Sequence, residues 1–250
     1  MPTNPPTTTA AFYARRGGRV ADWWTLLHPP YTAWHVSYVV IGAALAPRLS
    51  WAMLGATVLA FFLAVGLCAH ALDELHGRPL GTAISDAALR SISALSLGAA
   101  VVIGALAVPH AGPLLVPAIA AGVVLVLGYN LELFGGRLHT DLGFALAWGG
   151  FPLAVGFLAQ RPPLLHLATL GAALAVLAAI ALSIAQRRLS TPARLIRRRL
   201  TDITATAVRP DGAAMPVSRQ ELLAPLEGAL RAMALALPLL AAALLLARAH

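Results

Sequence analysis

The residues best suited to chemistry lie at the end of an apolar run, in the stretch CAHALDELHGRPLGT at positions 68–82. On a helix, residues three and four positions apart share a face, so His70, Asp73 and Glu74 are predicted to form one stripe. Three ionisable groups on one face of a membrane helix are costly unless they face a water-filled cavity or a bound ion. The stripe therefore predicts a polar site. The alternative is a charged boundary at the lipid–water interface, where Arg78 needs no chemical role.

The composition indicates a membrane protein. The chain of 250 residues is 59% hydrophobic and 11% charged, whereas soluble domains are about 45–50% apolar and about 25% charged. All 18 basic residues are arginine, which indicates genome composition and not a nucleic-acid surface. Nucleic-acid binding is not expected, because too little of the chain would lie outside the bilayer. The single Cys68 excludes a disulfide framework within the chain.

Seven segments have the length and apolar character of spanning helices. They are 31–47, 50–72, 90–109, 113–134, 141–160, 163–185 and 226–248. The predicted fold class is therefore all-α: a multi-spanning membrane helical bundle of about seven transmembrane helices. We expect a flexible cytoplasmic N-terminal tail over 1–28 and a single transmembrane domain over 29–250. A cytoplasmic loop with helical or amphipathic pieces is predicted over 186–225.

The arginines orient the predicted bundle, because cytoplasmic loops of membrane proteins carry an excess of positive residues. With the N-terminus inside, 15 arginines fall on the inner side; only Arg48, Arg161 and Arg248 fall outside. We therefore expect an integral protein of the cell membrane, with the N-terminus cytoplasmic and the C-terminus outside. The same orientation places the stripe near the inner leaflet.

The stretch at 68–82 resembles the first motif of the UbiA superfamily of intramembrane prenyltransferases. That motif reads N-D-x-x-D-x-x-x-D and is followed by an arginine, a proline and a hydrophobic residue. Its positions fall on Ala69, His70, Asp73 and Gly77, followed by Arg78-Pro79-Leu80. Of the family's acidic positions only Asp73 is kept, with Glu74 adjacent to it.

A second stretch, positions 127–159, is also similar to the family, with a tyrosine-asparagine helix end, a glycine-rich loop and a following helix. The resemblance implies that Tyr129, Asn130 and Glu132 face the same chamber as the stripe. Tyr129 as an aromatic of the membrane interface is the alternative. The segment around His35 resembles the start of the family's first helix, which makes His35 a further candidate.

The resemblance implies the chemistry of the family. Its acidic clusters hold Mg²⁺, which bridges the diphosphate of an isoprenoid donor. On this chain His70, Asp73 and Glu74 would be the catalytic residues, with Asp73 and Glu74 as the metal ligands. The partner would be an isoprenoid diphosphate or another lipid phosphate within the lipid bilayer. The predicted substrate-binding residues are His35, Arg78, Tyr129, Asn130, Glu132, Arg137, Gln186 and Arg187. Arg188 and Arg194 are also placed for phosphate binding.

The chain departs from the family at its second acidic motif. That motif belongs at the inner end of the sixth helix, where Ser183, Gln186, Arg187 and Arg188 stand instead. Either arginines take the diphosphate charge directly, or the scaffold handles another lipid. Two other classes stay open: a non-catalytic lipid-binding protein or transporter, and a lipid-modifying enzyme with a histidine/carboxylate metal site that includes His139 and Asp141.

Overall fold

The structure is a computed structural model that describes residues 12–15 and 17–248. Residues 1–11 and Arg16 of the predicted tail, and the last two residues of the predicted domain, lie outside the described residues.

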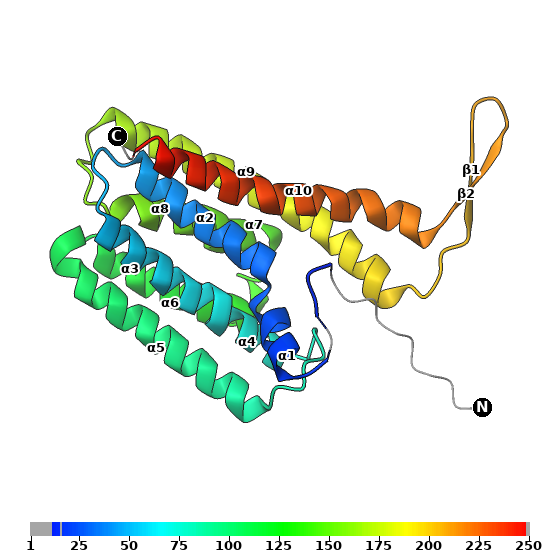
Figure 1. Ribbon diagram of the computed structural model, residues 1–250, viewed down its shortest axis with the longest axis horizontal. Coiled ribbons are helices and arrows are strands. Elements are labelled where there is room, and N and C mark those ends of the chain that lie inside the picture. Colours follow the sequence, from blue (N-terminus) through cyan, green and yellow to red (C-terminus); the bar gives the residue numbers. More distant parts are fainter. Residues whose placement is uncertain (1–11, 16, 249–250) are drawn as a thin grey trace.

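Helices account for most of the described chain (Figure 1). They are α1 (Arg19–Leu27), α2 (Pro29–Leu45), α5 (Asp86–Ala111), α6 (Leu115–Asn130), α9 (Leu167–Arg199) and α10 (Arg219–Leu246). Two further long helices contain a stretch of π-helix: α3 (Trp51–Phe61), η1 (Phe62–Ala69) and α4 (His70–Leu75) follow one another without a break, as do α7 (Asp141–Ala145), η3 (Leu146–Gly150) and α8 (Phe151–Leu158). A 3₁₀ turn, η2 (Phe134–Gly136), and the strands β1 (Ala205–Val208) and β2 (Ala214–Val217) complete the fold.

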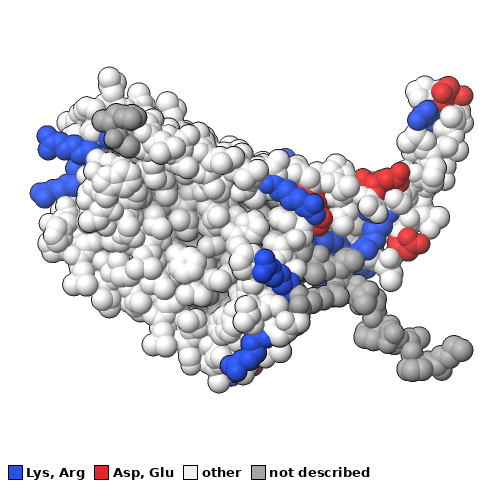
Figure 2. Space-filling view, in the orientation of Figure 1, with Lys and Arg blue, Asp and Glu red and all other residues white. Residues whose placement is uncertain are grey.

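Five helices in the described part of the chain are long and apolar enough to cross a membrane. They are Trp51–Leu75, Asp86–Ala111, Asp141–Leu158, Leu167–Arg199 and Arg219–Leu246. The two other predicted spans fall on α2 and α6, of 17 and 16 residues, which are about 26 and 24 Å long against a hydrocarbon core of about 30 Å. On the face shown in Figure 2, the charged side chains gather at the two ends and leave an uncharged belt between them. The molecule is compatible with a membrane helical bundle.

Helix α2 is the central helix of the bundle, packed against α8 and α10. The main buried cluster joins α2, α8, α9 and α10 and consists of Trp34, Tyr38, Ile41, Leu153, Ala179, Ala234, Leu237 and Ala241. Two glycines allow α2 and α8 to approach closely. A Cβ at Gly42 would collide with the Leu153 carbonyl, and one at Gly156 would collide with the Val39 carbonyl. Small residues at such contacts are typical of packed membrane helices.

Gly42→Ala should destabilise the protein by about 2 kcal/mol, because the added methyl group forces α2 and α8 apart. The measurement is the free energy of unfolding in mixed micelles. Gly55→Ala is the matched control, since nothing lies within 4 Å of a Cβ at Gly55 on α3. Equal effects of the two substitutions would contradict the close helix contact.

The region predicted as a cytoplasmic loop is mostly regular structure. Helix α9 continues to Arg199, and α10 begins at Arg219 with a capping box between Ser218 and Glu221. Both helices extend beyond the rest of the bundle (Figure 1), and β1 and β2 join them as an antiparallel hairpin. The purely helical prediction omitted this hairpin. Its turn has a recognisable sequence, Pro210-Asp211-Gly212, in which Gly212 has a positive φ of 83°.

The described end of the predicted N-terminal tail packs on the bundle. Residues 19–27 form α1, and Leu26 is buried in a cluster with Ala71, Ile84 and Leu89. Apolar burial of this kind explains why the segment is ordered although its chain neighbours are Pro/Thr-rich.

Candidate functional site: a polar cavity at one end of the bundle

A polar cavity of about 160 Å³ lies where the N-terminal segment, α2, α4, α7 and α9 meet. Helix α9 contributes a long face with lining residues at helical spacing. The described lining residues are Tyr13, His28, Tyr31, His35, His70, Asp73, Pro79, Leu80, Phe144, Gln186, Arg187, Ser190, Arg194, Arg197 and Arg198. From Gln186 to Arg198 this face is about 18 Å long. The cavity is therefore elongated along α9.

Five of the predicted site residues line this one cavity. They are His35 from α2, His70 and Asp73 from α4, and Gln186 and Arg187 from α9. Arg194, which the sequence analysis placed among the phosphate-binding candidates, also lines it.

Glu74 lies elsewhere, although it neighbours Asp73 in the sequence. It is fully buried. One carboxylate oxygen accepts from the Thr82 N–H at 2.8 Å and the Thr82 hydroxyl at 2.9 Å, and the other accepts from the Leu80 N–H at 2.9 Å. Successive helix residues point about 100° apart, so a face that presents His70 and Asp73 to the cavity turns Glu74 toward the following loop. Both oxygens of Glu74 are thus engaged in holding this loop.

Arg78 also stabilises this loop. Its guanidinium donates to the Thr82 carbonyl at 3.3 Å and the Ile84 carbonyl at 2.5 Å, and it pairs with the Asp86 carboxylate at the start of α5. Arg78 is not among the residues that line the cavity. The loop itself contributes Pro79 and Leu80 to the cavity wall, so Glu74 and Arg78 determine the position of that wall.

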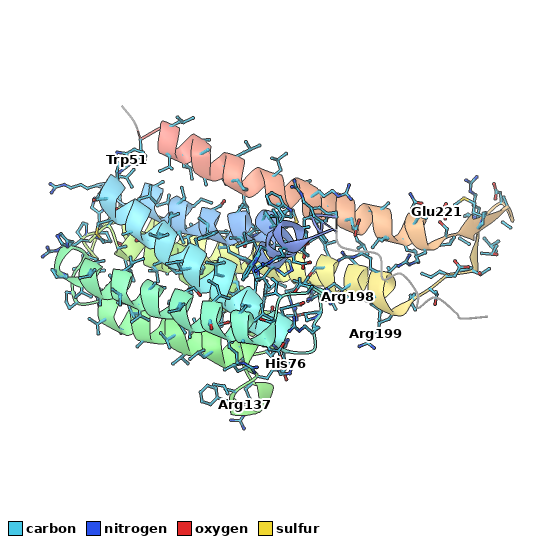
Figure 3. The ribbon with its side chains drawn as sticks, turned by 60° about the horizontal axis from the view of Figure 1, so that its bottom comes forward. Trp51, His76, Arg137, Arg198, Arg199 and Glu221 are labelled. Atoms are coloured by element: carbon cyan, nitrogen blue, oxygen red, sulfur yellow. The ribbon has the colours of Figure 1, made fainter. Side chains whose placement is uncertain are left out.

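The residues predicted from the second stretch, Tyr129, Asn130 and Glu132, do not line the cavity together. Tyr129 is buried beside it, with its ring stacked on His139 at 4.5 Å and 6.1 Å from the lining Phe144. The Asn130 amide donates to the Val126 carbonyl of its own helix at 2.7 Å. Glu132 and Arg137 are exposed. Figure 3 shows Arg137 at the periphery, apart from Arg198.

Three histidine rings line the cavity, and each π-helical stretch supplies a carbonyl that orients one of them. His35 Nδ1 donates to the Trp148 carbonyl in η3 at 2.8 Å, and His70 Nδ1 donates to the Gly66 carbonyl in η1 at 3.2 Å. The His28 ring packs edge-on against His70 at 4.3 Å. Burial lowers the pKa of His28 well below its ordinary value, so this imidazole is neutral at pH 7. Such π-helical turns are frequent at functional sites.

The lining charge is predominantly positive. Asp73 is the one carboxylate among the described lining residues, against Arg187, Arg194, Arg197 and Arg198. Arg187 pairs with Asp141 at 3.0 Å, and Arg197 pairs with Glu227 at 3.3 Å. Within the described chain no carboxylate lies within 4.0 Å of Arg194 or Arg198. Arg194 is half-buried and Arg198 is exposed, so this end of the cavity is an open, positively charged region that suits an anion.

Gln186 provides a second sign of a ligand-binding site. Its side chain is 4% exposed, and its Oε1 has no hydrogen-bond partner among the described residues. Buried polar atoms are hydrogen-bonded in nearly all native structures. An unpartnered amide in the cavity wall therefore indicates that a bound molecule or water satisfies it.

The predicted magnesium site depends on Asp73 and Glu74. No group of three or more His, Cys, Asp or Glu side chains in the described chain could hold a metal ion. The predicted pair of metal ligands is separated, because the loop occupies both oxygens of Glu74. Of these two carboxylates only Asp73 lines the cavity. Mg²⁺ would therefore need phosphate oxygens for its remaining ligands, as is common for this ion.

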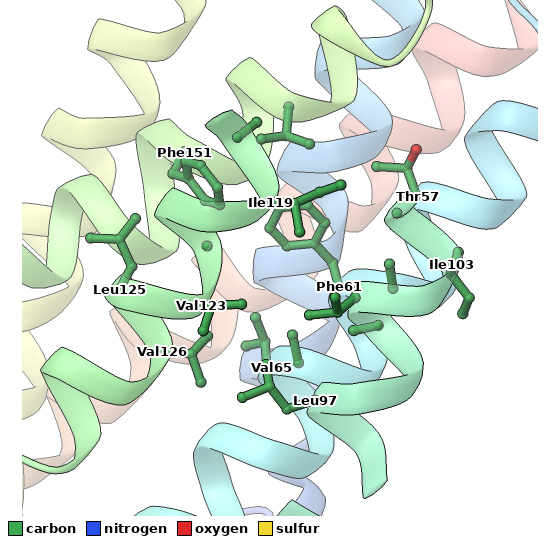
Figure 4. Close-up of a pocket in the computed structure, with 18 of the residues that line it drawn as sticks. Thr57, Phe61, Val65, Leu97, Ile103, Ile119, Val123, Leu125, Val126 and Phe151 are labelled. Atoms are coloured by element: carbon green, nitrogen blue, oxygen red, sulfur yellow. The ribbon is translucent and has the colours of Figure 1, made fainter. Parts of the chain in front are cut away.

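A second cavity, of about 100 Å³, is apolar and lies between α3, η1, α5, α6 and α8 (Figure 4). Its walls are alanine, valine, leucine, isoleucine and phenylalanine side chains, with Thr57 as a polar exception. Trp148 lines this cavity, and its carbonyl binds His35 of the polar cavity. The two cavities are therefore neighbours on either side of Trp148.

Some lining residues were not predicted: Tyr13, Phe144, Ser190, Arg197 and Arg198. Arg197 and Arg198 lie on the part of α9 that was predicted as a cytoplasmic loop with helical pieces, and nothing in that prediction distinguished them from the neighbouring arginines. Tyr13 lies in the predicted tail, and its only sequence signal is the aromatic pair Phe12-Tyr13 beside two arginines.

The chain was compared with protein-family models, curated proteins and solved structures, and none of them matches it.

Proposed function

We propose that this protein is an integral membrane protein of UbiA-like type that binds an isoprenoid diphosphate or a related lipid phosphate in the polar cavity. The observation that carries this proposal is the pair of arginines, Arg194 and Arg198, that line the cavity without an ion-pair partner in the described chain. Arginine guanidinium groups bind phosphate oxygens through strong, charge-assisted hydrogen bonds. The adjacent apolar cavity supports a ligand that carries a hydrocarbon chain as well as a phosphate.

In this proposal the seven predicted helical segments enclose the ligand, with the polar cavity on the cytoplasmic side. The activity would be transfer or cyclisation of the prenyl group. Asp73 would be the protein ligand of a phosphate-bound Mg²⁺, and Mg²⁺ supplies charge neutralisation of the diphosphate. His70 lies beside Asp73 on α4, and Arg187 is held over the Phe144 ring at 5.3 Å. These residues bind and orient the phosphates.

A second candidate function is non-catalytic binding of the same lipid phosphate. It is favoured by the segment around Gln186, where the family's second acidic motif is replaced by residues without a carboxylate, and by Asp73 being the one carboxylate among the described lining residues. Binding needs positive charge, which the four arginines supply, and does not need a second acidic cluster.

The test is the melting temperature of the purified protein in detergent with farnesyl diphosphate, measured with Mg²⁺ and with EDTA. Binding raises the melting temperature, because a ligand that binds only the folded state stabilises it. Stabilisation with release of inorganic diphosphate supports the transferase, and stabilisation without turnover supports the binding protein. No stabilisation under either condition would contradict both.

A further inference from the structure

A short N-terminal segment contributes to the wall of the polar cavity. This segment, residues 12–15, precedes α1 and lies against α1 and α2, and Tyr13 is one of the cavity-lining residues. No chemical role is implied for it by the sequence, which here reads as part of a tail.

Hydrogen bonds hold the segment in place at two points. The Trp24 indole N–H donates to the Tyr13 carbonyl at 3.1 Å. The Thr25 hydroxyl accepts from the Arg15 N–H at 2.9 Å and donates to the Arg15 carbonyl at 3.1 Å. The Arg15 guanidinium also lies over the Trp24 ring at 4.1 Å. The backbone from the Tyr13 carbonyl to Arg15 is therefore fixed to α1.

The ring of Tyr13 is fixed as well. It packs edge-on against His28 at 5.0 Å and against Tyr31 at 5.6 Å. Both partners line the cavity, so the ring belongs to a continuous aromatic wall. A side chain held in this way loses little further freedom when it binds a ligand.

The hydroxyl group of Tyr13 can donate a hydrogen bond to a ligand. It makes no hydrogen bond to any other described residue, and it shares the cavity with Arg194 and Arg198. Burial raises the pKa of Tyr13, so the hydroxyl stays protonated at physiological pH and can donate to an anion.

We propose that Tyr13 is a ligand-binding residue whose hydroxyl donates a hydrogen bond to a phosphate oxygen held by Arg194 and Arg198. The inference rests on the proposed function, because it requires a phosphate in the cavity. It adds that the N-terminal segment completes the phosphate site and sets its affinity. Trp24 and Thr25 act as positioning residues, because they hold the segment and do not line the cavity.

The experiment is isothermal titration of the detergent-purified full chain with inorganic diphosphate and with farnesyl diphosphate. Tyr13→Phe keeps the ring and removes the hydroxyl, and it should weaken both ligands about tenfold, as expected for one hydrogen bond to a charged acceptor. Tyr38→Phe is the control, because it removes a tyrosine hydroxyl from a residue of α2 that does not line the cavity, and it should change affinity less than twofold. Trp24→Phe tests the segment's attachment and should weaken both ligands without removing any group from the cavity.

The outcomes distinguish failure of the role of Tyr13 from failure of the proposed phosphate-binding function. Unchanged affinity of Tyr13→Phe, or an equal loss for Tyr38→Phe, would overturn the role of Tyr13 while the cavity remains a phosphate site. A loss confined to farnesyl diphosphate would also overturn it, since a hydroxyl that donates to a phosphate oxygen should matter for both ligands. Failure of the unmodified protein to bind either ligand would instead remove the proposed function.

Discussion

Replacing Arg194 and Arg198 together with glutamine should weaken the binding of farnesyl diphosphate by about 100-fold. Each arginine is expected to make a charge-assisted hydrogen bond to phosphate, worth about tenfold in affinity when lost. Neither residue has a carboxylate within 4.0 Å in the described chain, so the substitutions break no ion pair there. Glutamine and arginine have similar helix propensities, which keeps α9 intact. Titration calorimetry measures the change.

The control for this prediction is the double variant Arg188→Gln, Arg199→Gln. These two residues lie on the same helix and are exposed, as Arg198 is, but they are not among the residues lining the cavity (Figure 3 shows Arg199). The net charge of the protein changes equally in both double variants. Affinity should fall less than threefold in the control. Equal losses in the two variants would mean that the phosphate responds to overall charge and has no defined site at Arg194 and Arg198.

Glu74→Ala should lower the free energy of unfolding by about 3 kcal/mol. The buried carboxylate accepts three hydrogen bonds from the loop that follows α4, and its removal leaves those donors without partners. Unsatisfied buried donors cost about 1–3 kcal/mol each, and part of this cost is recovered as the loop relaxes toward water. Unfolding in mixed micelles measures the loss, with Glu132→Ala as the control because Glu132 is exposed.

Asp73 provides the sharper comparison, because it is the sequence neighbour of Glu74 and carries the same charge. Asp73 lines the cavity, and no hydrogen bond within the described chain ties its carboxylate to the loop. Asp73→Ala should therefore leave the free energy of unfolding within about 1 kcal/mol of the unmodified protein. A loss as large as that of Glu74→Ala would contradict the division of roles between the two carboxylates.

The positions of the helices follow closely from hydropathy, because a continuous apolar run near 20 residues long has few other stable forms in a membrane. The predicted 90–109 is α5, the predicted 141–160 begins and ends within two residues of α7–α8, and the predicted 50–72 is α3 with η1 and α4. What hydropathy could not indicate was the continuation of α9 beyond residue 185. Arginine and leucine favour a helix there by propensity and not by hydrophobicity. Arg187 and Arg194 were therefore selected as phosphate-binding candidates by residue type and membrane side, whereas Arg198 on the same face was not selected.

The stripe at His70, Asp73 and Glu74 shows what helical spacing can and cannot predict. The i, i+3, i+4 rule placed the three residues on one side of a helix. Two of them, His70 and Asp73, line the cavity. Glu74 instead binds the loop, because the loop folds back toward the end of α4 and the Leu80 and Thr82 N–H groups donate to the Glu74 carboxylate. This return depends on backbone conformations such as the positive φ of Gly77, Arg78 and Gly81, which the spacing of side chains does not encode.

The cavity wall formed by Tyr13 could not be derived from the sequence for a similar reason. Its position depends on two hydrogen bonds. One joins Trp24 to the Tyr13 carbonyl across 11 residues, and the other joins Thr25 to Arg15 across 10 residues. Aromatic residues near a membrane surface are common, so their presence alone does not distinguish a cavity wall from an interface belt.

The most direct test of the central claim is a cryo-electron microscopy structure of the protein with bound farnesyl diphosphate. We expect density for the two phosphates between Arg194 and Arg198 on α9, with Asp73 on the facing wall and the Tyr13 hydroxyl at the outer edge. Diphosphate density at exposed arginines such as Arg137, with the polar cavity filled by water alone, would contradict the claim.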